Sequence, residues 1–157
     1  QAVITTPDMS ELDMDSAAVK TNGVDVSNKK GWYVNFPQSG EKSMSPGLIF
    51  KSQLLFTTYS PTLSGASNCS PVTGQTNLYK FCMPYGKLCA GDSSYTTSNI
   101  TLGLAGKPQL LITQDPTTGD YTVNPIVGTK IVQPLNAGPG TPYMESTKKW
   151  REKTINE

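Results

Sequence analysis

Histidine is missing from the chain altogether, and cysteine occurs only three times in 157 residues. Without histidine, no serine–histidine or cysteine–histidine pair can activate a nucleophile within this chain. The lack of histidine and of any Cys-x-x-Cys pair also argues against a zinc site. We therefore expect no catalytic residue of these classes and no zinc.

The chain also lacks an excess of charge of either sign and has no long apolar run. The 13 lysines and arginines stand against 12 aspartates and glutamates spread along the chain, so no basic stripe points to nucleic acid. No apolar run approaches the roughly 18–20 residues of a membrane span, and no charged segment followed by an apolar one marks a signal peptide. We expect neither a nucleic-acid partner nor a membrane span.

Turn-forming residues are plentiful instead, with 14 glycines and 12 prolines. Such a composition is typical of short strands joined by many turns and disfavours a helical bundle. A chain of 157 residues is long enough for one domain with its own core. The composition thus favours an all-β fold.

The segment from Gly31 to Tyr59 and the residues after it carry the clearest strand pattern. Four short runs are rich in aromatic and β-branched residues and are bounded by turn residues: Trp32–Phe36, Gly47–Phe50, Leu54–Tyr59 and Asn77–Cys82. In the first run, Trp32, Val34 and Phe36 alternate with polar neighbours, so one side is expected to be buried. We predict a four-stranded antiparallel meander, which has the size of one blade of a β-propeller.

A second meander is predicted nearer the end of the chain. Its strands are Pro108–Thr113, Tyr121–Val127 and Lys130–Pro134, with a turn at 115–120. Residues 83–107 between the two meanders are predicted to be mostly loop. Asp115 and Asp120 are interpreted as turn formers.

The two ends of the chain are less regular. Residues 2–7 are consistent with an edge strand cut short by a proline. A short helix is predicted within Asp8–Lys20, capped by Ser10 with Asp13 at the capping-box position. The charged tail after residue 142 allows another short helix, with Trp150 as the apolar anchor expected to dock on the sheet.

The three cysteines leave their pairing open. Cys82 and Cys89 bracket a Pro-Tyr-Gly turn, so that a disulfide between them would close a small hairpin loop. Cys69–Cys82 and Cys69–Cys89 are the rival pairings, and three free buried thiols remain a further alternative. Any disulfide would imply an oxidising compartment.

The acidic residues near the start offer the only carboxylate cluster, formed by Glu11, Asp13, Asp15 and Asp25. We interpret it as a solvated acidic surface rather than as a catalytic pair. Asp13 and Asp15 could open a calcium loop of the EF-hand type. Ala18 and Val24 then stand where that loop needs glycine and glutamate, so the pattern fails.

Several segments of the first predicted meander resemble a known family. GWYVNFPQSGEK, then SPGLIF, LLFTTYSPT and TNLYKF, in this order, are similar to the C-terminal propeller of the PilY1-type proteins of the type IV pilus. The similarity covers roughly Val24 to Lys80, and the tail with Trp150-Arg151-Glu152 resembles the end of that family. It implies a partial β-propeller of antiparallel four-stranded blades. A blade takes about 40–50 residues and a closed ring needs four to eight blades, so this chain would be a fragment.

The resemblance also implies an organisation and a role. Residues 1–30 would end a preceding blade, residues 31–142 would form propeller blades, and residues 143–157 would be the tail. The chain would be a non-enzymatic part of the pilus tip and assembly machinery, in adhesion and twitching motility. Its partners would be minor pilins, the rest of the parent propeller, and a host or abiotic surface. It would act in the periplasm, at the outer membrane or on the cell surface.

The family's calcium loop of alternating aspartate and asparagine is not found in this sequence, so we expect no cofactor and assign no metal ligand. Two other functions remain as alternatives. One is a quinoprotein-dehydrogenase-like propeller enzyme, which would need a closed ring holding a quinone and calcium. The other is a secreted carbohydrate-binding module, which the exposed aromatic residues would suit.

Overall fold

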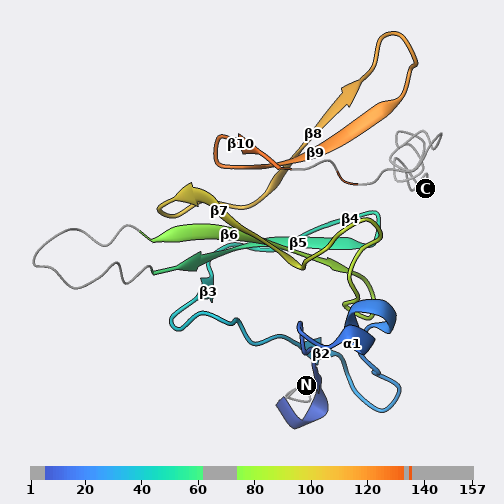
Figure 1. Cartoon of the computed structure of the whole chain (residues 1–157), viewed down its shortest axis with the longest axis vertical. Coiled ribbons are helices and arrows are strands. Elements are labelled where there is room, and N and C mark those ends of the chain that lie inside the picture. Colours follow the sequence, from blue (N-terminus) through green and yellow to red (C-terminus); the bar gives the residue numbers. More distant parts are fainter. Residues whose placement is uncertain (1–5, 62–73, 133–134, 136–157) are drawn as a thin grey trace, which may run out of the picture.

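A central antiparallel sheet organises the molecule in the computed structural model, which describes residues 6–61, 74–132 and 135 (Figure 1). The strand order is β3-β5-β6-β7, and β4 also pairs with β5. The strands are β3 (Lys42–Ser43), β4 (Leu48–Phe50), β5 (Gln53–Ser60), β6 (Gln75–Cys82) and β7 (Thr96–Leu102). The described sheets are not closed, so the chain is an all-β protein with open sheet edges.

The two longest strands, β5 and β6, are buried on both faces. They pair without a break from Gln53 opposite Cys82 to Ser60 opposite Gln75. Leu55 and Leu78 lie in the core on one face of this sheet, whereas Tyr79 and Phe81 lie in the core on the other. Because side chains alternate along a strand, both strands need apolar residues at consecutive positions.

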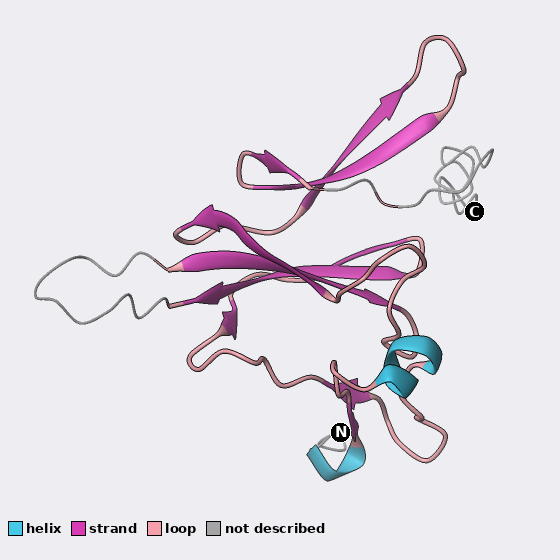
Figure 2. Cartoon of the chain, in the orientation of Figure 1, coloured by secondary structure: helices cyan, strands magenta, loops and turns pink. Residues whose placement is uncertain are grey.

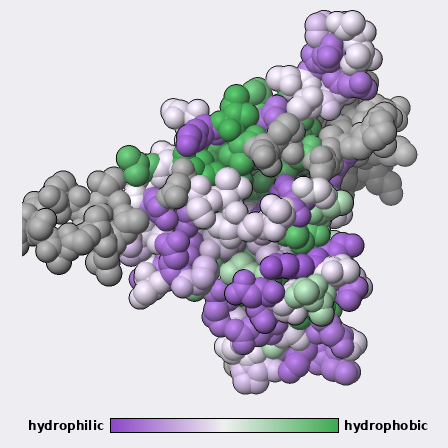
Figure 3. Space-filling model, in the orientation of Figure 1, coloured by the Kyte–Doolittle hydropathy of each residue, from purple (hydrophilic) through white to green (hydrophobic). Residues whose placement is uncertain are grey.

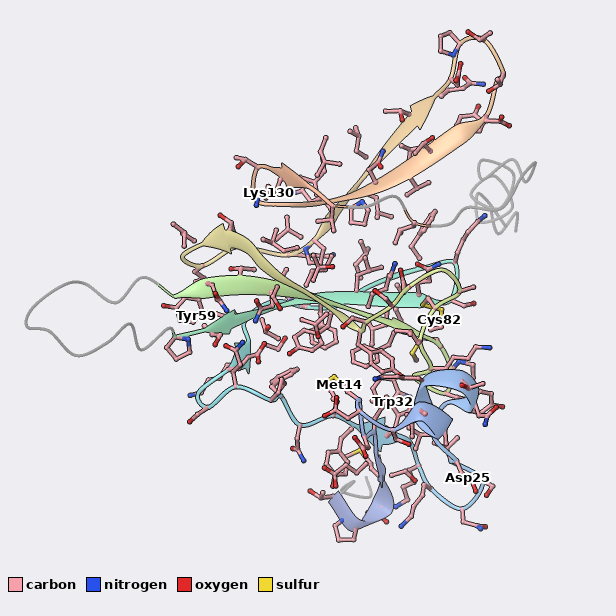
Figure 4. The ribbon with its side chains drawn as sticks, viewed as in Figure 1. Met14, Asp25, Trp32, Tyr59, Cys82 and Lys130 are labelled. Atoms are coloured by element: carbon pink, nitrogen blue, oxygen red, sulfur yellow. A yellow bond between two sulfur atoms is a disulfide. The ribbon has the colours of Figure 1, made fainter. Side chains whose placement is uncertain are left out.

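The N-terminal segment covers one face of the central sheet. It contains η1 (Thr6–Asp8), β1 (Ser10–Glu11), α1 (Ala17–Asn22) and β2 (Trp32–Tyr33), with β1 and β2 paired in parallel. Leu12 and Val24 join Tyr79, Phe81 and Tyr95 in one buried cluster. Figure 4 shows Met14 and Trp32 between this segment and the sheet.

A second sheet covers the opposite face, so that the molecule has three layers (Figure 2). Its strands are β8 (Gln109–Gln114), β9 (Tyr121–Val127) and β10 (Lys130–Ile131), in the order β10-β9-β8. An aliphatic core joins it to the central sheet and contains Leu55, Leu78, Ile100, Ala105, Val123, Val127 and Leu135. The loop end of the β8–β9 hairpin extends past the central sheet (Figure 1).

The predicted four-stranded blade is only partly correct. Its last three strands appear as β4, β5 and β6, paired as expected. The first predicted strand is wrong as a member of this sheet, because Trp32 and Tyr33 pair in parallel with Ser10 and Glu11. The expected burial is found nevertheless, since Trp32, Val34 and Phe36 all pack against the aromatic cluster.

The prediction of a mostly irregular segment at 83–107 is wrong for β7, which pairs with β6 from Gln75 opposite Leu102. Its sequence, TTSNITL, is largely polar, so the hydrophobic pattern gave little signal. Ile100 is its one residue in the aliphatic core. The three strands of the second meander are confirmed. Strand β8 is shifted by one residue from the predicted bounds, and β9 matches them. Strand β10 begins as predicted but ends at Ile131, and residues 133–134 of the predicted strand lie outside the described part.

The N-terminal helix exists but begins later than predicted. Ser16, not Ser10, is the N-cap, and its hydroxyl accepts a hydrogen bond from the Val19 N–H. Ser10 lies instead in β1. The predicted edge strand at residues 2–7 is replaced at Thr6–Asp8 by a 3-10 helix, and its first residues lie outside the described part. The predicted tail helix and Trp150 also lie outside it.

Candidate functional site

A buried carboxylate, that of Glu41, lies on the aromatic face of the central sheet and is only 7% exposed. One of its oxygens, Oε1, accepts hydrogen bonds from the hydroxyl of Thr58, the amide of Asn77 at 3.1 Å and the hydroxyl of Tyr79 at 3.0 Å. The other oxygen, Oε2, is buried without a hydrogen-bond partner. Glu41 therefore gathers donors from β5 and β6.

The neighbouring strand holds Glu41 in this place. Lys42 and Ser43 pair with Tyr59 and Thr58, which brings the preceding residue over the ends of β5 and β6. Close by, the hydroxyl of Ser60 donates to the side-chain oxygen of Gln38. The pKa of Tyr79 is raised, first because the hydroxyl is buried and second because the Glu41 carboxylate lies beside it. The sequence alone did not predict this cluster, since a single glutamate after a turn has the pattern of a surface residue.

The chemistry open to this cluster is limited. A carboxylate held by hydroxyl and amide donors stabilises a fold, but a metal centre needs several such ligands. The part of the chain that the structure describes contains no group of three or more His, Cys, Asp or Glu residues arranged to hold a metal ion.

A disulfide between Cys82 and Cys89 closes the hairpin loop after β6. The Cα atoms are 5.2 Å apart, and the N–H of Cys82 donates to the carbonyl of Lys87 at 2.9 Å. This is one of the three pairings that the sequence left open, and Cys69 lies outside the described residues. An oxidising, extracellular compartment is compatible with this bond.

The disulfide loop is tied to the N-terminal segment. The indole N–H of Trp32 donates to the carbonyl of Pro84 at 2.8 Å, and the N–H of Val24 donates to the carbonyl of Tyr85 at 2.8 Å. Gly86 has φ +66°, and a Cβ there would lie 2.4 Å from the Leu12 side chain. The turn predicted between the two cysteines therefore needs its glycine, both for its backbone and for close packing.

A shallow hollow of about 400 Å³ lies beside this loop, lined by residues 22–27 and Tyr85. Asp25 stands at this hollow and is labelled in Figure 4. The pKa of Asp25 is lowered because its carboxylate accepts hydrogen bonds from Ser27. This carboxylate thus stabilises its own turn.

The other predicted acidic residues are exposed, and two of them accept hydrogen bonds from groups of the same N-terminal segment. Glu11 accepts hydrogen bonds from the side chains of Tyr33 and Asn35, and Asp13 accepts one from the N–H of Asp15. These contacts fit the interpretation of a solvated acidic surface.

The predicted turn between β8 and β9 is built around Asp115. Its carboxylate accepts hydrogen bonds from the N–H groups of Thr117 and Thr118, which lowers its pKa. Asp120 donates its own N–H to the hydroxyl of Thr118. Both aspartates are therefore turn formers, as expected.

Exposed apolar side chains gather on the side of the molecule that β7 to β10 form. Leu102 is 78% exposed, Leu104 63% and Ile131 62%. Figure 3 shows apolar colour over this region and mainly hydrophilic colour over the N-terminal segment. Patches of this kind often mark contacts with other proteins. The sequence alone did not predict this surface, because an apolar run does not indicate which of its residues another layer covers.

Comparison of the chain with protein-family models, with curated proteins and with solved structures found no match. Within residues 6–61 and 74–132, no helix has the length and apolar character that crossing a membrane requires. The geometry of the chain itself must therefore support any functional conclusion.

Proposed function

We propose that this chain is a non-enzymatic interaction module of the type IV pilus machinery, the C-terminal propeller part of a PilY1-like protein. It binds minor pilins and contributes to adhesion and twitching motility at the cell surface. The observation that carries the proposal is the open all-β architecture with apolar residues left exposed on the β7–β10 side. Such a surface suits binding better than bond-making chemistry.

Three features support this reading. The strings that resemble the family run from β2 to β6, and five of their aromatic residues meet in one cluster: Trp32, Phe36, Phe56, Tyr79 and Phe81. The second sheet packs face to face on the central sheet, as neighbouring propeller blades do, and this supports a partial propeller. The Cys82–Cys89 disulfide suits a periplasmic or cell-surface location.

The proposal can be tested with a double variant, Leu102→Asp with Leu104→Asp. Both side chains are exposed, so the fold is expected to tolerate the change while the apolar surface is lost. We expect the variant to bind purified minor pilins at least about tenfold more weakly, which is about 1.4 kcal/mol. In the bacterium that carries the gene, twitching zones are expected to shrink while protein levels stay unchanged.

Ile49→Asp is the matched control, because Ile49 is 64% exposed but lies on β4. The proposal would be contradicted if cells whose parent protein lacks this chain still twitched normally and that shortened protein still bound minor pilins. A bound quinone with dye-linked dehydrogenase turnover would favour the enzyme instead, and saturable binding to a glycan would favour the carbohydrate-binding module.

A further inference from the structure

Strand β8 forms an outer edge of the second sheet, whose order is β10-β9-β8. Over its 6 residues it pairs with β9 in unbroken register, from Gln109 opposite Ile126 to Gln114 opposite Tyr121. An edge strand offers a row of N–H and C=O groups to another strand. Proteins usually guard such edges with charge, proline, a bulge or short length.

The other described edges of the two larger sheets carry such guards, whereas β8 does not. Strands β3 and β10 have 2 residues each and contain Lys42 and Lys130, and β4 has 3 residues. The pairing of β7 with β6 contains a register shift. The sequence of β8, QLLITQ, has neither charge nor proline. Among the described strands at the edges of these sheets, β8 is the long and unguarded one.

The hydrogen bonds of the hairpin decide which groups of β8 point outward. The N–H of Asp115 donates to the carbonyl of Asp120 at 2.8 Å, so its backbone faces β9. Because backbone direction alternates along a strand, Gln109, Leu111 and Thr113 face β9 as well. The backbone groups of Leu110, Ile112 and Gln114 therefore point to the free edge. The side chain of Ile112 is 48% exposed and that of Leu111 36%, one on each face of the sheet.

We propose that β8 pairs with β8 of a second copy of this chain, antiparallel about a two-fold axis through Leu111. The charges at the two ends of the strand favour this arrangement. Lys107 precedes β8 and Asp115 follows it, both exposed and both the same distance in sequence from Leu111. The two-fold axis places Lys107 of each copy opposite Asp115 of the other.

The same register matches the outward backbone groups. Leu110 lies opposite Ile112 of the other copy, and their N–H and C=O groups exchange hydrogen bonds. Pro108, which has no N–H, ends the pairing on each side. A shift of the register by two residues would still match backbone groups, but it would separate Lys107 from Asp115. The charges thus select one register, and the second sheet continues across both copies.

A cysteine at the axis tests the geometry directly. In this register the two Leu111 residues form a non-hydrogen-bonded pair with Cα atoms about 4.5 Å apart, within the usual range for a disulfide. We expect Leu111→Cys, in a full-length Cys69→Ser background, to form a covalent dimer under mild oxidation. Ile131→Cys is the matched control, because Ile131 is 62% exposed but lies on β10.

A proline at the edge tests the hydrogen bonds. Ile112→Pro removes an outward N–H and leaves the pairing with β9 in place. We expect it to raise the dimer dissociation constant roughly tenfold or more in sedimentation equilibrium. Ile112→Val keeps the N–H and is expected to dimerise as the unchanged chain does. Circular dichroism of both variants separates loss of pairing from loss of fold.

A charge reversal at Lys107 tests the register, while Asp115 is left unchanged because its carboxylate holds the β8–β9 turn. Lys107→Glu is expected to weaken self-association more than Lys107→Gln does, because it places two carboxylates opposite each other at each end of the paired strands. A chain that stays monomeric at about 100 µM, a concentration at which even a weak pair would be visible, would overturn the proposal. A dimer that Ile112→Pro leaves unchanged and that Leu111→Cys does not cross-link would overturn it too. Binding of a different protein's strand to β8 without self-association would also do so.

Discussion

The two faces of the central sheet are covered by different kinds of contact. On the N-terminal side, aromatic rings meet with centroids 4.9 to 6.2 Å apart, and directed hydrogen bonds end at Glu41 and Pro84. On the β8–β10 side the core is aliphatic, and Val123 and Val127 are buried while Leu102 and Ile131 remain exposed. One side of the sheet is therefore closed by directional contacts, whereas the other leaves apolar side chains exposed.

The largest expected effect comes from the aromatic side. Phe81 is fully buried, with its ring centroid 4.9 Å from Tyr95 and 5.4 Å from Trp32. We expect Phe81→Ala to lower the free energy of unfolding by about 3–5 kcal/mol in urea titrations. Val127→Ala, a fully buried residue on the aliphatic side, is expected to cost about 2 kcal/mol.

Ile49→Ala serves as the exposed control and is expected to change stability by less than about 0.5 kcal/mol. If Val127→Ala cost as much as Phe81→Ala, the two faces would contribute equally, and the comparison would fail.

Loss of the buried carboxylate is expected to come next. Glu41→Ala leaves the donors of Thr58, Asn77 and Tyr79 without their acceptor, and each unsatisfied buried donor costs about 1–3 kcal/mol. We expect a total loss of roughly 3 kcal/mol by chemical denaturation. Glu41→Gln keeps an acceptor oxygen and is expected to lose less. Equal losses for both variants would show that the charge matters rather than the acceptor.

The disulfide is expected to contribute somewhat less. Cys82 and Cys89 are separated by 7 positions in sequence, so the closed loop is short. Replacing both by serine is expected to lower the stability by about 2–3 kcal/mol, because the unfolded chain gains freedom. Hydrogen exchange is expected to rise near Trp32 and Tyr85 and to stay unchanged in β9. A uniform rise through β9 would mean that the disulfide supports both sides of the sheet.

The smallest expected effect is a loss of stability at alkaline pH. The raised pKa of Tyr79 means that its neutral hydroxyl is favoured in the folded state. Its contribution is fully present below the ordinary tyrosine pKa of about 10 and is lost as the pH rises beyond that value. Tyr79→Phe is expected to cost about 1 kcal/mol at neutral pH and to flatten the decline. An unchanged decline in the variant would assign it to another group.

Much of the fold follows from local patterns. Strands β5, β6, β8 and β9 are apolar runs bounded by turn residues, and Asp115 and Gly119 mark the hairpin turn. The loop between Cys82 and Cys89 contains its own turn signal. These features depend on neighbours in sequence, so the sequence predicts them.

Other features depend on contacts distant in sequence. Trp32 has the pattern of a strand, but its partner Ser10 could not be read from alternation. Ile100 is the one described side chain of β7 in the core, so the rest of that strand can be polar. Glu41 is buried because the pairing of β3 with β5 places it against side chains of β5 and β6. The predicted domain boundary at residue 31, the role in adhesion and the β-propeller architecture stay predictions.

The pairing of Ser10 with Trp32 has a practical consequence for anyone who expresses this protein. Leu12 and Val24 belong to the same buried cluster as Phe81, so residues 1–30 include part of the cover of the aromatic face. A shortened chain that began at Gly31 would open those rings to water. Such a chain is expected to precipitate on purification, even if its remaining strands pair correctly.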